Sequence, residues 1–129
     1  MEQLIAHMFG DYVIQSDWMA NNKTKPGLFG LLVAFYHAAT YTIPFFFITQ
    51  NPIALGVIMS SHALIDHFRL AAKYTQLRNW NWTTSNGFPH DRPVWLTTWV
   101  VIFIDNTFHL LINYLARCRS VCATHGETF

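Results

Sequence analysis

The chain has 129 residues, of which 52% are hydrophobic and 16% aromatic, while only 12% are charged. Soluble domains carry about 25% charged residues, so this composition indicates a single domain embedded in a membrane. The formal net charge of +1 provides no positive field to attract nucleic acid, and we expect no nucleic-acid partner.

The first predicted helix runs from Glu2 to about Ala20 and is the least apolar of four candidate helices. His7 and Asp11 stand four residues apart in it, so both side chains lie on one helical face. Gln15 lies on the same face and could hydrogen-bond a ligand. The mixed composition fits either a helix that crosses the bilayer or one that lies in its interface, and both alternatives stay open.

The second predicted helix, Leu28 to Ile48, contains about 21 residues without a formal charge, close to the roughly 20 that cross a bilayer core. His37 lies near its middle. The third, Pro52 to about Leu70, begins with a proline suited to a first helical turn. It carries His62 and Asp66, again four residues apart, while His67 is rotated roughly 140° from His62 and is expected at the rim.

Residues 78 to 93 predict an interfacial loop, and Val94 to Ala116 predicts the last helix. Asp105 and His109 form the third pair with a spacing of four in this chain. We divide the chain into a helical bundle over residues 1–116 and a flexible tail over residues 117–129. The tail contains a C-x3-C-x2-H sequence at Cys118, Cys122 and His125, for which an inert surface cluster is the better interpretation.

Depth in the bilayer is a second argument that the polar residues meet. A residue about ten positions into a spanning helix lies roughly 15 Å deep, near the middle of the hydrocarbon core. His37, His62 and Asp105 all stand about nine to eleven positions from the starts of their helices. Four antiparallel helices would therefore place their imidazoles and carboxylates in one layer, as in bundles that hold metals.

Imidazole and carboxylate ligands without thiolates favour a divalent metal, with zinc as the first choice. The candidate ligands are His7, Asp11, His37, His62, Asp66, Asp105 and His109. These exceed the needs of one tetrahedral ion, so either two ions bind or some aspartates orient the histidines. Metal-bound water could hydrolyse a lipid-linked or phosphate-containing substrate, with Asp11 or Asp66 as catalytic base.

Two other interpretations of the same residues stay open. The pairs could hold the helices together by hydrogen bonds, or they could form a path for protons or ions. In either case the chain is a non-enzymatic membrane protein, either an ion or proton conductor or a partner-binding component of an envelope complex. A bundle of this size could also assemble into a homo-oligomer that buries its polar faces.

The segment HMFGDYVIQSDWMANNK, from His7 to Lys23, resembles the H-x2-G-D-[FY]-x2-Q-x-D-W motif of domain of unknown function 3307, a family of small bacterial and phage membrane proteins. The resemblance to this family extends to later residues, which are His37, the H-x3-D-H of His62 to His67 and the D-x3-H of Asp105 to His109. The resemblance implies a multi-pass protein of the bacterial inner membrane and carries no established activity. The residue types are also reminiscent of membrane-bound metal-dependent hydrolases, by analogy alone. We expect an all-α bundle of about four membrane helices.

Overall fold

A computed structural model describes the backbone of residues 1–124 and the side chains through Arg119. Every regular element in this range is helical, as predicted. In chain order these are α1 (Glu2–Phe9), the π-helical turn η1 (Gly10–Ile14), α2 (Asp17–Asn22), α3 (Leu28–Thr42), the 3-10 turn η2 (Ile43–Phe47), α4 (Pro52–His67), α5 (Leu70–Arg78) and α6 (Val94–Thr124).

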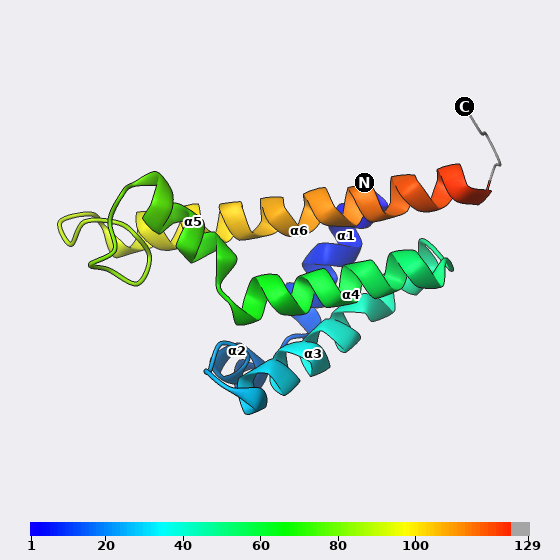
Figure 1. The fold of residues 1–129 in the computed structure, drawn as a ribbon, viewed down its shortest axis with the longest axis horizontal. Helices are drawn as coiled ribbons and strands as arrows, with labels where there is room; N and C mark the ends of the chain where they lie inside the picture. The colour runs from blue at the N-terminus through cyan, green and yellow to red at the C-terminus, as the bar shows by residue number, and fades with distance from the viewer. Residues whose placement is uncertain (125–129) are drawn as a thin grey trace.

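The three longest helices form the frame of the molecule. α3 packs against α4, and α4 packs against α6, with consecutive helices running in opposite directions (Figure 1). α1 crosses this frame and contacts α6 and η2, while α5 contacts α6. The N-terminal segment therefore brings its polar residues to the same region as the polar residues of α3, α4 and α6.

The first segment is not one continuous helix, which differs from the expectation for Glu2 to Ala20. The chain leaves the π-helical turn at Gln15, whose backbone is extended, and α2 begins after Ser16. The Ser16 hydroxyl accepts a hydrogen bond from the backbone N–H of Met19 at 3.3 Å, which caps α2. Each piece is too short to cross a bilayer as a straight helix.

Within the described residues, two helical stretches are long and apolar enough to cross a membrane, Leu28–Phe47 and Val94–Arg119. These stretches correspond to the second predicted helix, Leu28 to Ile48, and to the last, Val94 to Ala116. α4 contains 16 residues, fewer than the roughly 20 that span a hydrocarbon core.

The third predicted helix divides into two where it was expected to be continuous. α4 ends at His67, and Arg69 adopts a left-handed backbone conformation (φ 51°, ψ 49°) before α5 begins at Leu70. The connection after α5 has no helix, as expected, and is held to α5 by hydrogen bonds. The Thr75 hydroxyl donates to the Asn86 carbonyl at 2.6 Å, and the Asn79 amide donates to the Gly87 carbonyl at 3.0 Å.

The last helix is longer than the sequence indicated. α6 continues past Ala116 to Thr124, so part of the segment expected to be a flexible tail is helical. Cys118 is a free, exposed thiol. The side chain of Cys122 and all of His125 lie outside the described residues, so the predicted C-x3-C-x2-H cluster does too.

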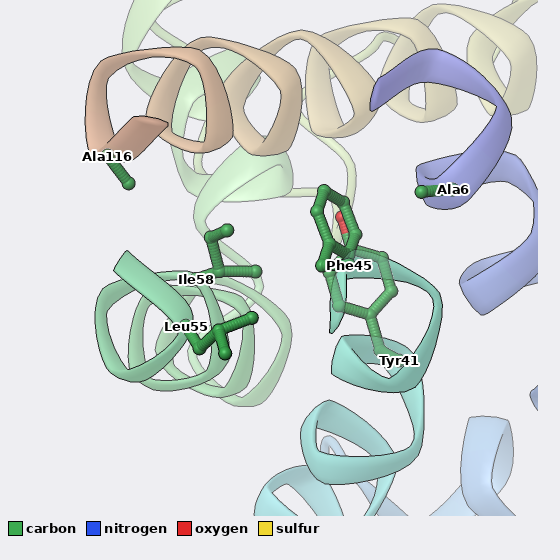
Figure 2. Packing of buried hydrophobic residues seen from close by; sticks show 6 residues of the cluster. All are labelled: Ala6, Tyr41, Phe45, Leu55, Ile58 and Ala116. Carbon is green, nitrogen blue, oxygen red and sulfur yellow. The ribbon is translucent and has the colours of Figure 1, made fainter. Parts of the chain in front are cut away.

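The apolar core consists of two clusters between the long helices. Figure 2 shows the larger one, formed by Ala6, Tyr41, Phe45, Leu55, Ile58 and Ala116. The second is small: Ala34 and Ala38 of α3 pack against Ala63 of α4. Because alanine side chains are short, α3 and α4 approach closely there. His37 and His62 are sequence neighbours of these alanines, and the close approach brings their rings together.

Candidate metal centre

The polar residues that were expected to converge lie together, with Asp105 at the edge of the group. His7, His37, His62 and His109 are at most 1% exposed, and Asp66 is 7% exposed. The Asp11 side chain is 12% exposed, and that of Asp105, 3.4 Å from His109, is 31% exposed. α1, η1, α3, α4 and α6 each contribute to this buried centre.

The inner part of the centre is formed by His37, His62 and Asp11. The Nε2 atoms of the two histidines lie 3.0 Å apart, and Asp11 Oδ1 lies 3.3 Å from each of them. Two ligands about 2.0–2.1 Å from one ion at a tetrahedral angle are about 3.3 Å apart. The three atoms therefore have the mutual spacing of ligands on a single ion, and they could hold one.

A second group shares one member with the first. His62 Nε2 lies 3.2 Å from Asp66 Oδ2, and His109 Nε2 lies 3.5 Å from Asp66 Oδ1. These three residues also could hold a metal ion. The centre thus offers two overlapping ligand sets, and His62 belongs to both.

Buried nitrogen and oxygen atoms that lack a hydrogen-bond partner show how well a cation would fit the centre. Asp11 Oδ1 and His109 Nε2 are buried without a hydrogen-bond partner, which costs free energy that a bound cation facing Asp11 would offset. The Nδ1 atoms of His37 and His62 also lack partners. This departs from the common arrangement in which a metal-bound imidazole donates its second N–H to an oxygen.

One cation of the protein already contacts the centre. Lys23, in the connection between α2 and α3, places its ammonium 2.6 Å from Asp66 Oδ2 and 2.6 Å from Gln15 Oε1. No helical periodicity in the sequence connects Lys23 to Asp66, so this contact was not predicted. Gln15, expected to contact a ligand, accepts a hydrogen bond from this ammonium.

His7 has both ring nitrogens engaged and is less suited to bind metal than the sequence indicated. Its Nε2 donates to Asn106 Oδ1 at 3.1 Å, so its Nδ1 accepts from the Tyr41 hydroxyl at 2.8 Å. The Asn113 amide donates to the same hydroxyl at 2.7 Å. These hydrogen bonds join α1, α3 and α6, and those at the Tyr41 hydroxyl are buried. Tyr41, four residues after His37, is the member that the sequence analysis missed.

His67 lies away from the centre, in agreement with its predicted rotation on the helix. Its Nδ1 is 3.0 Å from the Lys23 carbonyl oxygen, which makes it a donor to the connection before α3. This hydrogen bond holds the backbone of Lys23, whose ammonium contacts Asp66 of the centre.

Comparison with known proteins gives one family and no annotated relative. The matching family model is described as a protein of unknown function (DUF3307), and it covers residues 1–118. No curated protein and no solved structure matches the chain. The matched region contains every residue of the buried centre, and the chain belongs to the DUF3307 family.

Proposed function

We propose that this protein is a multi-pass protein of the bacterial inner membrane that binds a divalent metal ion, zinc by preference. The observation that carries the proposal is the 3.0 and 3.3 Å spacing of His37 Nε2, His62 Nε2 and Asp11 Oδ1. Two neutral imidazoles and one carboxylate form a ligand set that zinc favours.

The surface of α6 supports the placement in a membrane. Its large apolar side chains are exposed along much of the helix, namely Trp95, Trp99, Phe103, Leu111, Tyr114 and Leu115. Monomeric soluble proteins rarely expose apolar patches of such extent. Contact with lipid would cover this surface, and an oligomer or an envelope protein would cover part of it.

The reaction that suits such an ion is hydrolysis of a lipid-linked or phosphate-containing substrate. Three protein ligands leave a fourth position for water, whose pKa a zinc ion lowers to about 7. In this arrangement Asp11 is a ligand, so Asp66 is the better candidate for the catalytic base. The partly exposed side chains of Asp11 and Asp105 mark the edge from which a substrate would approach.

Metal analysis of the purified protein tests the binding site. After chelation and reloading with zinc in detergent, we expect about one ion per chain in the wild type, the number that three to four ligands require. His37→Gln and His62→Gln should each lose the ion, while His90→Gln, on an exposed loop residue, should keep it. Folded wild-type protein without metal, or equal metal in all variants, would overturn the proposal.

A proton or ion path is the second candidate, and one observation favours it. Nitrogen and oxygen atoms of Asp105, His109, Asp66, His62, His37 and Asp11 follow one another at 3.4, 3.5, 3.2, 3.0 and 3.3 Å. Chains of aspartate and histidine can act as proton relays. Here each imidazole faces both of its neighbours through Nε2, so conduction would require the rings to turn or water to join the series. Proton flux into liposomes carried by metal-free wild type, and abolished in His62→Gln, would favour conduction over metal binding.

A further inference from the structure

A basic pocket lies next to the buried centre and is not used by the proposed function. The α2–α3 connection and the junction between α4 and α5 line an open pocket of about 460 Å³. His67, Arg69 and Lys73 line it together with the hydroxyl residues Thr24 and Ser85. We propose that this pocket binds a phosphate group, either of a lipid headgroup or of a soluble phosphoester.

The charge of the lining residues is the first argument. Arg69 and Lys73 are exposed and carry positive charge, and no carboxylate lines the cavity. Through Arg119, no ion pair connects either side chain to an acidic residue. Two cations that share a pocket without a counter-ion favour an anionic ligand, and arginine suits phosphate in particular because it donates two parallel hydrogen bonds.

The backbone gives the second argument. Arg69 occupies the left-handed region at φ 51°, an uncommon conformation for a residue with a side chain. The turn starts α5 directly at the pocket, with Arg69 immediately before the helix and Lys73 in its first turn. No side chain accepts a hydrogen bond from the first turn of α5, so the N-terminus of this helix is uncapped next to the pocket.

The position of the pocket relates it to the metal centre. His67 of the pocket follows Asp66 of the centre, and Thr24 follows Lys23, whose ammonium contacts Asp66. His67 Nδ1 lies 3.0 Å from the Lys23 carbonyl oxygen, so residues that adjoin both sites are in direct contact. A phosphate held in the pocket would bring an attached ester close to the centre. This use of the pocket rests on the proposed function, whereas binding of phosphate does not.

Phosphate binding can be measured on the full chain in zwitterionic detergent with EDTA, so that a bound metal contributes nothing. The probes are inorganic phosphate and dioleoyl phosphatidic acid, titrated by calorimetry against wild type and an Arg69→Gln, Lys73→Gln double variant. The matched control, Arg78→Gln with Arg92→Gln, removes the same charge outside the pocket. We expect the double variant to bind at least about tenfold more weakly, because each lost charge-assisted contact is worth a factor of this order, and the control to bind as wild type does.

Binding of phosphatidic acid alone would identify a lipid headgroup as the ligand, and binding of both probes would admit soluble phosphoesters. Absence of binding to wild type, or equal affinity in the double variant and the control, would overturn the inference. Lys73→Gln alone serves if the double variant loses its helical circular dichroism. Zinc uptake is measured separately on EDTA-free portions of the same preparations: phosphate binding by a wild type that takes up no zinc there would retain this inference and reject the proposed metal site.

Discussion

Replacing Lys23 by methionine tests whether its ammonium opposes a metal ion at the buried centre. The side chain is 15% exposed and bonds Asp66 Oδ2 at 2.6 Å, and that oxygen is 3.2 Å from His62 Nε2. The Lys23 nitrogen is therefore within about 6 Å of His62 Nε2, and within about 8 Å of an ion bonded to that nitrogen at about 2 Å.

Coulomb's law gives the size of the effect. A unit charge and a divalent ion about 8 Å apart repel by roughly 4 kcal/mol at an effective dielectric constant of about 20, and by roughly 1 kcal/mol in water. Removing the ammonium should therefore strengthen zinc binding by about five-fold to several hundred-fold, since about 1.4 kcal/mol corresponds to a factor of ten. It also frees the Asp66 carboxylate, which acts in the same direction.

Competition with a chromophoric zinc chelator measures this change in purified wild type and Lys23→Met. Lys25→Met is the matched control, because Lys25 belongs to the same connection and is exposed. Without metal, the Lys23 variant should melt at a lower temperature, because removing one partner of a buried ion pair leaves Asp66 uncompensated. Equal zinc affinity in wild type and both variants would refute the reasoning.

Three further predictions concern the surroundings of the centre. Tyr41→Phe keeps the ring stacked on His62 but removes the hydrogen-bond partner of His7 Nδ1 and of the Asn113 amide, so the unfolding free energy should fall by about 1–3 kcal/mol with the zinc content unchanged. Gly30→Ala should lower the melting temperature, because its Cβ would overlap the Lys25 carbonyl, whereas Gly56→Ala, with open space, should not. Acidification from pH about 7.5 to about 5 should release zinc, because imidazole ligands bind metal only when neutral, and dialysis with metal analysis would measure it.

Each of these expectations has a result that contradicts it. An unchanged melting transition in Tyr41→Phe would mean that the buried hydrogen bonds do not hold the helices together. A Gly30→Ala variant as stable as Gly56→Ala would reject the close contact between α3 and the preceding connection. Zinc retained in full at the lower pH would argue against histidine ligands.

The sequence predicted much of the fold and the composition of the centre. Apolar stretches of sufficient length identified the helices that contain His37 and His109, and the spacing of four residues identified the pairs His62–Asp66 and Asp105–His109. These features are local, because helical periodicity fixes which side chains share a face whatever the neighbouring helix is. The break before α2 and the left-handed Arg69 were not predicted, since single caps and turns override an apolar pattern only at particular residues.

Only the tertiary structure decided how the members of the centre divide their roles. Packing of the alanines of α3 and α4 places the Nε2 atoms of His37 and His62 3.0 Å apart, whereas depth in the sequence predicts only that the two rings share a layer. Other tertiary contacts engage His7 in hydrogen bonds to Tyr41 and Asn106, leave Asp105 at the edge, and bring Lys23 from a loop to Asp66. Periodicity specifies the face of each helix, but which faces meet, and which charge lies between them, depends on contacts between residues far apart in the chain.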